Sequence, residues 1–178
     1  MILTDLEDPT AAFRANKPEW AYAPLSGAGA AKVGGRFNRQ GIEALYFSQD
    51  RLTALDEYQQ CSSLLPPCTL CQYTLGISGL VDLRALTDDG QWDADWHNWT
   101  ADWREQRFNQ GITPITWMLG DLAMEQGHKG IIFPSMVRAG GTNIVIYKDM
   151  LEPEDKLDVF DDGLLPDDRA SWSRRDLR

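Results

Sequence analysis

The sequence predicts a single α+β domain, in which short apolar strands alternate with a few helices. Three observations lead to this fold class. The chain has 178 residues, which is the size of one domain with a proper core. Runs typical of strands and runs with helical periodicity are interleaved along it. No linker, internal repeat or low-complexity tract divides it, so we expect one folded unit over residues 1–178.

Composition and charge exclude several classes of protein. The chain is 43% hydrophobic and 25% charged, which is typical of an ordered globular protein. A net charge of −10 argues against direct binding of nucleic acid, although a few convergent arginines could still bind an anion. The N-terminus lacks the pattern of a signal peptide, and no apolar run approaches the roughly 20 residues that span a membrane. We therefore expect a cytoplasmic protein without membrane contacts.

The three cysteines do not predict a metal site. Cys68 and Cys71 form a C-x-x-C pair, but a structural zinc site needs four ligands. The other candidates, Cys61, His97 and His128, supply no second pair with ligand spacing. Small buried thiols near a strand are the better interpretation, and their odd number fits a reducing compartment. No metal is predicted.

The N-terminal part of the chain has little periodicity. Residues 1–16 are interpreted as a short leading helix or arm, and residues 17–35 as a loop rich in Gly, Ala and Pro. Residues 27–32 superficially resemble a phosphate-binding loop. They lack the third glycine of the dinucleotide fingerprint, and no Ser or Thr follows Lys32 as in a P-loop. Neither nucleotide-binding fold is predicted.

A strand and a helix with one notable carboxylate come next. Residues 43–48 predict the strand, and Ser48 is expected to cap a helix from about residue 49 to residue 61. Glu57 falls at the edge of the apolar face of this helix, where a carboxylate can be half shielded and still reach a ligand. A solvated surface glutamate is the alternative. The expected apolar face consists of Leu52, Ala54, Leu55, Tyr58 and Cys61.

The middle of the chain predicts a second strand and a tryptophan-rich helix. Residues 68–75 form the strand, and residues 81–84 are a short third strand or its continuation. Four tryptophans follow with spacings of 4, 3 and 4, which predict one stripe of a helix. Core packing is the favoured interpretation of this stripe and a binding face is the alternative. The tryptophans are Trp92, Trp96, Trp99 and Trp103.

The last third predicts a helix, two buried strands and a tail. The helix is expected from an N-cap at Thr113 to a stop at Gly127, and the strands at 130–133 and 144–147. Ser135 lies where the first strand ends, a position from which ligand-binding residues commonly point, and nothing resembles the G-x-S-x-G of a hydrolase. The core is expected over about 13–150. The acidic tail, 151–178, is expected to wrap over the domain or be partly mobile, with basic Arg174 and Arg175 near its end.

Three groups near residue 40 point to nucleotide-sugar chemistry. Gly34 and Gly35 deliver Arg36, whose guanidinium fork suits a diphosphate or a carboxylate. Tyr46 offers a flat face for stacking. Glu57 can stabilise positive charge that develops on a sugar.

The order of five motifs resembles the RES domain family, the toxins of bacterial toxin–antitoxin pairs. The motifs are Gly-Gly-Arg-Phe-Asn, Ala-Leu-Tyr-Phe, a helix with Glu57, Phe-Pro-Ser and Gly-Gly-Thr-Asn, and the resemblance covers about residues 13–173. Phe37 stands where the family usually has tryptophan. The family's Pro-Ser-Ala-Arg reads Pro-Ser-Met-Val-Arg here, so that Arg138 comes one place late.

This resemblance implies a fold and a set of site residues. The family is similar in fold to the ADP-ribosyltransferase toxins, with a split mixed β core, flanking helices and a cleft for NAD. The implied catalytic residues are Arg36, Tyr46, Glu57 and Ser135. The implied ligand-binding residues are Gly35, Asn38, Arg138 and Asn143.

The resemblance also implies an activity and a partner. NAD is the substrate, inorganic phosphate the co-substrate, and the products are nicotinamide and ADP-ribose-1″-phosphate, with no further cofactor. From the residues alone, water or a protein side chain remains open as the acceptor, which would make an NAD glycohydrolase or an ADP-ribosyltransferase. A non-catalytic acidic binding protein is the alternative of another class. The implied partner is an Xre-like antitoxin that blocks the cleft.

Overall fold

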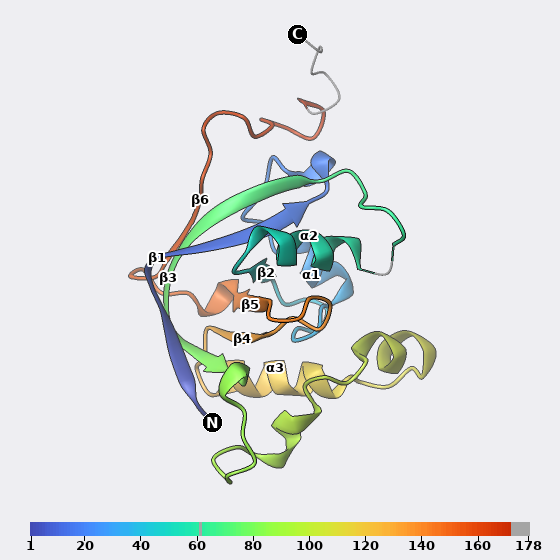
Figure 1. Cartoon of the computed structure of the whole chain (residues 1–178), viewed down its shortest axis with the longest axis vertical. Coiled ribbons are helices and arrows are strands. Elements are labelled where there is room, and N and C mark those ends of the chain that lie inside the picture. Colours follow the sequence, from blue (N-terminus) through green and yellow to red (C-terminus); the bar gives the residue numbers. More distant parts are fainter. Residues whose placement is uncertain (61, 172–178) are drawn as a thin grey trace.

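The protein has a mixed α+β fold, as the sequence predicts. The computed structural model describes residues 1–60 and 62–171, and within them one six-stranded sheet is accompanied by three α-helices and several short turns of 3-10 or π helix (Figure 1). The strands are β1 (Leu3–Asn16), β2 (Ala44–Ser48), β3 (Thr69–Asp82), β4 (Gly130–Pro134), β5 (Thr142–Tyr147) and β6 (Lys156–Val159). The helices are α1 (Ala28–Val33), α2 (Arg51–Gln59) and α3 (Ile115–Glu125).

The sheet is split into two halves. The strand order is β1-β2-β5-β4-β3-β6, and β1 also pairs with β3 along most of its length. The strands β2, β5 and β4 form one antiparallel half, while β1, β3 and β6 form the other. A short parallel pairing of β3 with β4 and a single pair, Phe13 with Ser48, join the halves.

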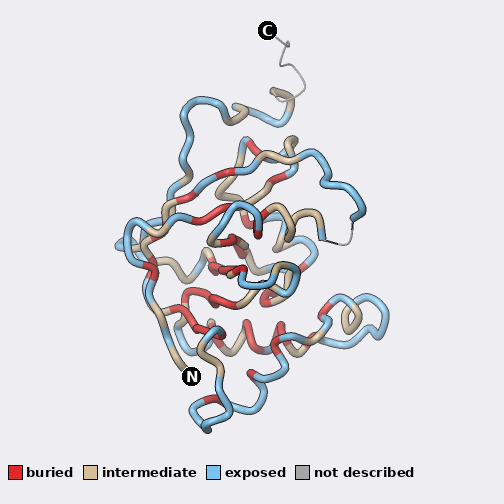
Figure 2. The backbone as a smooth tube through the Cα atoms, in the orientation of Figure 1, coloured by how far each residue is buried: buried red, intermediate tan, exposed pale blue. Residues whose placement is uncertain are grey.

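The central strands are apolar because both of their faces are covered. Successive side chains of a strand point to opposite faces. In β5, Val145 and Tyr147 pack with α3 and the tryptophan-rich segment, whereas Ile144 and Ile146 pack with the half of the sheet formed by β1 and β3. Figure 2 shows this buried layer in β2, β4 and β5. The prediction that residues 130–133 form a central strand is confirmed.

The prediction of a leading helix or arm at residues 1–16 was wrong. This segment is the long strand β1, antiparallel to β3 from Leu3 to Asn16. Its partner lies more than 50 residues away, so local pattern could not identify it. Pro9 is tolerated because it lies where the register shifts between Leu6 and Thr10, and no ladder bond requires its missing N–H. The expected loop 17–35 also contains the short helix α1.

The helix α2 begins two residues later than expected. Asp50, and not Ser48, is its N-cap, and its Oδ1 accepts a hydrogen bond of 2.9 Å from the Thr53 N–H. The buried face is also narrower than predicted: it contains Thr53 and Ala54, whereas Leu52 is 55% exposed. Cys61, the last residue of the expected face, lies outside the described residues.

The four tryptophans are buried, but they do not lie on one helix. Their segment contains a 3-10 turn at Ala94–Asn98 and a π turn at Glu105–Asn109. The side chains of Asp93 and Asp102 accept hydrogen bonds from backbone N–H groups just after them, which favours short turns over a continuous helix. The tryptophans are 1–9% exposed, and Trp92, Trp96 and Trp99 belong to the hydrophobic core, so core packing is confirmed for these three. Trp103 is buried but also lines a cleft, and the prediction of a single helix was wrong.

The remaining elements agree with the sequence except at their ends. Strand β3 continues to Asp82, which confirms residues 81–82 as a continuation. Helix α3 ends just before Gly127, as predicted. Thr113 does not cap its N-terminus; instead, Gln106 Oε1 accepts a hydrogen bond of 3.0 Å from the backbone N–H of Ile115. No helix among residues 1–60 and 62–171 is long and apolar enough to cross a membrane.

The C-terminal segment packs on the domain through β6 and a buried ion pair. Strand β6 pairs with β3, and Leu157 packs against the core. Lys129, just before β4, is 8% exposed and forms ion pairs with Asp155 at 2.8 Å and Glu152 at 2.7 Å. The predicted basic cluster at 174–175 lies outside the described residues.

Candidate functional site

A cleft of about 950 Å³ collects most of the residues singled out from the sequence. Its walls come from β1, α1, β2, α2, the tryptophan-rich segment and the loops after β4. The predicted site residues that line it are Gly35, Arg36, Tyr46, Glu57 and Asn143.

Arg36 is held at the cleft by backbone carbonyls. Its Nη1 donates to the carbonyls of Trp99 at 3.1 Å and Ala101 at 3.0 Å, and the indole of Trp117 donates to the Gly35 carbonyl at 2.7 Å. Burial lowers the pKa of Arg36 from its usual value, and the nearby Tyr46 and Glu57 partly offset this effect. An arginine remains a cation under these conditions, so the cleft carries a fixed positive charge.

Asn38 is placed behind the cleft. It is completely buried, and its amide donates to the carbonyls of Ala30, Arg39 and Ile42. Its Oδ1 accepts a hydrogen bond of 2.8 Å from the Tyr46 hydroxyl. The structure therefore does not bring Asn38 to the cleft with the other predicted ligand-binding residues, and gives it a positioning role instead.

Tyr46 is rigidly oriented by this arrangement. Besides donating to Asn38, its hydroxyl accepts from the Phe37 N–H at 2.9 Å. Burial raises its pKa, so the phenol stays neutral at physiological pH. A Cβ on Gly35 would lie 2.5 Å from the Tyr46 hydroxyl, which explains why glycine occupies that position.

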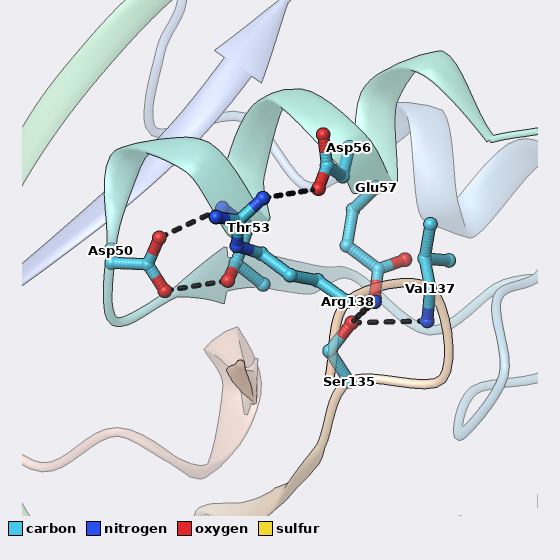
Figure 3. A network of polar contacts seen from close by, with 7 residues as sticks. All are labelled: Asp50, Thr53, Asp56, Glu57, Ser135, Val137 and Arg138. Atoms are coloured by element: carbon cyan, nitrogen blue, oxygen red, sulfur yellow. Dashed lines mark hydrogen bonds and ion pairs between the residues drawn. The ribbon is translucent and has the colours of Figure 1, made fainter. Parts of the chain in front are cut away.

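Glu57 is the centre of a polar network on the cleft wall. Its Oε1 accepts hydrogen bonds from Ser135 Oγ at 2.7 Å and from Asn143 Nδ2 at 2.5 Å. Ser135 Oγ in turn accepts from the backbone N–H groups of Val137 and Arg138, as Figure 3 shows. With both N–H groups directed at its oxygen, the serine hydroxyl has its proton free to donate to Glu57.

Local structure explains how these residues meet. Asn143 on β5 lies opposite Ser48 on β2, and Ser48 Oγ donates to Asn143 Oδ1 at 2.7 Å, which orients the amide toward Glu57. Ser135 lies on the loop after β4. The same loop passes close to α2 at Gly141, where a Cβ would lie 2.5 Å from Thr53 Oγ1. The carboxylate on α2 is thereby brought to both partners.

Arg138 does not line the cleft. Its Nη1 forms an ion pair of 2.8 Å with Asp56 of α2 (Figure 3). The structure therefore does not bring this predicted ligand-binding residue together with Glu57. Its backbone N–H still supports Ser135.

Several cleft residues were missed by sequence reasoning. Ser48 was interpreted as a helix cap, Trp103 was favoured as a core residue with a binding face as the alternative, and Arg14, Arg104 and Phe108 were not assigned to a site. Only the fold brings them to residues 36–57, so no local pattern marked them. In the described part of the chain, no group of three or more His, Cys, Asp and Glu side chains is placed to hold a metal ion.

Comparison with known proteins identifies the family. A model of the RES domain matches residues 11–168. The chain belongs to the RES domain family. Among solved structures, a chain of the M. tuberculosis MbcT–MbcA toxin–antitoxin complex matches with a TM-score of 0.54 and 19% sequence identity, covering 95% of this chain and 90% of that chain. No curated protein matches the sequence. At this identity the structural likeness shows a common fold.

The cleft of this RES domain is lined by both positively and negatively charged side chains. Its lining includes Arg14, Arg36 and Arg104, and Glu57 is the one carboxylate among the described lining residues. Aromatic rings of Tyr46 and Trp103 stand among them. Such a site can bind an anionic ligand with a flat ring and place one fixed carboxylate beside it.

Proposed function

We propose that this RES domain is the toxin of a toxin–antitoxin system and that it degrades NAD by phosphorolysis of the nicotinamide–ribose bond. The observation that carries the proposal is the fixed carboxylate of Glu57, held by Ser135 and Asn143 in a cleft whose lining also includes three arginines and several aromatic rings. NAD has matching parts: an anionic diphosphate, a flat nicotinamide ring, and a ribose that becomes cationic during cleavage.

The reaction needs stabilisation of positive charge more than it needs an acid. As the bond from the ribose anomeric carbon to the pyridinium nitrogen breaks, its electron pair moves to the nitrogen and neutral nicotinamide leaves. The ribose passes through an oxocarbenium-like state, which a carboxylate beside it stabilises. An oxygen of inorganic phosphate then bonds to the anomeric carbon and gives ADP-ribose-1″-phosphate. Two hydrogen bonds fix Glu57 before the reaction begins, so little reorganisation is required.

The other cleft residues take supporting roles in this proposal. Arg36 binds the diphosphate or the adjoining ribose, and Tyr46 presents its ring to nicotinamide. Ser135 and Asn143 orient Glu57. Asn38 fixes Tyr46 from behind, since its carbonyl oxygen holds the phenol.

An antitoxin is the proposed partner. The matched structure belongs to a toxin–antitoxin complex, and the family resemblance points to an Xre-like antitoxin that blocks the cleft. The cleft has an apolar rim that suits an inserted peptide: Val33, Phe108, Met136 and Val137 line it and are 48–62% exposed.

The test is incubation of the purified protein with NAD, with and without inorganic phosphate, and mass spectrometry of the products. We expect nicotinamide and a phosphorylated ADP-ribose only when phosphate is present. Glu57→Gln should lower kcat by at least about 100-fold, the scale of one lost electrostatic stabiliser. Glu154→Gln, the same change on the exposed C-terminal segment, should leave kcat unchanged.

The other outcomes separate the alternatives. Free ADP-ribose in both reactions would make the protein a glycohydrolase, and modified protein in place of a soluble product would make it a transferase. Intact NAD in every reaction would favour the non-catalytic binding protein. In cells, expression of the wild-type chain alone should arrest growth, and Glu57→Gln should relieve the arrest.

A further inference from the structure

Most of the described arginines outside the cleft have carboxylate partners, whereas those of the cleft do not. Four described arginines outside the cleft form ion pairs: Arg39, Arg84, Arg138 and Arg169. The other two, Arg51 and Arg107, lie over the rings of Phe13 and Trp117 instead. The three that line the cleft form no such pair within residues 1–60 and 62–171: Arg14, Arg36 and Arg104. In a protein with a net charge of −10, unpaired arginines gathered in one cleft indicate a site for an external anion.

Two of these guanidinium groups lie within electrostatic range of one another. Burial is the main cause of the lowered pKa of Arg36, and the charge of Arg104 lowers it further. The guanidinium of Arg36 donates hydrogen bonds through Nη1, and that of Arg104 donates one through Nη2. The other guanidinium nitrogens of both side chains have no hydrogen-bond acceptor among the described residues. Both side chains therefore keep donors for a ligand.

Arg104 is held in place by three contacts. Its guanidinium lies 4.5 Å from the centre of the Trp103 ring. Its Nη2 donates to Gln60 Oε1 at 3.1 Å, just beyond the end of α2, and its backbone N–H donates to Asp102 Oδ1 at 3.0 Å. The side chain thus reaches from the tryptophan-rich segment to the helix that carries Glu57.

Arg36 is anchored to the same segment. The carbonyls that fix its Nη1 belong to Trp99 and Ala101, a few residues before Arg104. The ring of Trp103 also packs against that of Trp117, with centroids 6.5 Å apart, and Trp117 donates to the Gly35 carbonyl. Arg36 is consequently fixed to the backbone segment that carries Arg104 before any ligand arrives, which reduces the entropy lost on binding.

We propose that Arg36 and Arg104 together form a two-arginine site for a phosphate group. Two nearby cations repel one another, and a bound phosphate removes this repulsion while it accepts hydrogen bonds from both forks. The inference rests on the proposed function for the source of the phosphate, which is either the diphosphate of NAD or the inorganic phosphate that accepts ADP-ribose. In both cases the site places the phosphate group in the cleft that Glu57 lines.

The test is isothermal titration calorimetry, which gives the dissociation constant of the purified protein for inorganic pyrophosphate and, separately, for inorganic phosphate. Arg104→Met keeps the length of the side chain and removes its charge and donors. We expect it to weaken binding of one of these anions by about tenfold or more, and Arg104→Lys to weaken it less. Arg107→Met is the matched control, because Arg107 lies over Trp117 outside the cleft lining, and it should bind as the wild type does.

Each outcome of the titration has a definite meaning. Weaker binding of pyrophosphate assigns the site to the diphosphate, and weaker binding of phosphate alone assigns it to the acceptor. Unchanged binding of both anions to Arg104→Met would overturn the site, as would an equal loss in Arg107→Met. Because the titration requires no turnover, a protein that binds pyrophosphate through Arg104 and leaves NAD intact would refute the proposed function and retain the site.

Discussion

The substitution Gly35→Ala tests how closely residues pack around Tyr46 at the cleft. In Gly35→Ala the new Cβ would lie 2.5 Å from the Tyr46 hydroxyl and 2.6 Å from Asn38 Oδ1. This is roughly 0.9 Å short of the 3.4 Å at which ordinary contact begins. Both neighbours are fixed by hydrogen bonds, so the strain cannot be relieved by a side chain that simply rotates away.

The expected loss in the free energy of unfolding follows from these contacts. Overpacking of this kind costs about 1–3 kcal/mol, and losing the bond from Tyr46 to Asn38 costs about 1 kcal/mol more. We therefore expect the free energy of unfolding to fall by roughly 2–4 kcal/mol. With a urea slope of about 1–3 kcal/mol per molar, the unfolding midpoint should fall by at least roughly 0.7 M.

Urea unfolding followed by circular dichroism measures this change. Gly29→Ala is the control, because Gly29 lies in α1 and a Cβ there would meet nothing within 4 Å. Alanine at such a helical position should stabilise the protein by about 0.5–1 kcal/mol. Equal midpoints for Gly35→Ala and Gly29→Ala would refute the close packing inferred around Tyr46.

Two further predictions concern stability. Lys129→Met should lower the free energy of unfolding by about 3–5 kcal/mol in urea titrations, because it leaves the buried Asp155 without its cation. Lys156→Met breaks an exposed pair with Asp8 and should change the stability much less, so similar losses in both variants would contradict the buried pair. The pKa of Asp50 lies below its usual value of 3.8, mainly because its carboxylate accepts a hydrogen bond from the Thr53 side chain. The N-cap formed by the ionised Asp50 therefore stabilises the fold above pH 3.8, and this stabilisation is lost as the pH falls through the lowered pKa. Asp50→Asn should therefore lose less stability than the wild type between about pH 5.5 and about pH 3 in thermal melts, and equal losses would contradict the assignment.

The sequence predicted the elements whose signals are local. The strands at Ala44–Ser48 and Gly130–Pro134 are short apolar runs bounded by turn residues, and both were located within a residue or two. The helix that ends before Gly127 was found for the same reason. Strand β1 was missed because its polar, proline-containing segment becomes a strand only through pairing with β3.

The tryptophan-rich segment shows how burial can be predicted without secondary structure. A spacing of 4, 3 and 4 correctly indicated that four rings are buried. It did not indicate a helix, because Asp93 and Asp102 satisfy N–H groups locally and end each turn early.

The family resemblance supplied most, but not all, of its residues correctly as cleft residues. Gly35, Arg36, Tyr46, Glu57 and Asn143 line the cleft, whereas Asn38 and Arg138 do not, and the catalytic and binding roles remain predictions. Arg104 could not be found in this way. Its relation to Arg36 depends on a segment of turns whose path the sequence pattern did not specify.

The two partners of Glu57 also determine when the cleft can exist during synthesis. Glu57 and Asn143 are 86 residues apart in the chain. At about 5–20 residues per second, a ribosome needs roughly 4–17 s to travel between them. During that interval Arg36, Tyr46 and Glu57 have been made, but β5 is not yet present to pair with β2 and orient the carboxylate. A nascent chain that stops before Thr142 therefore lacks the strand that completes the polar network around Glu57.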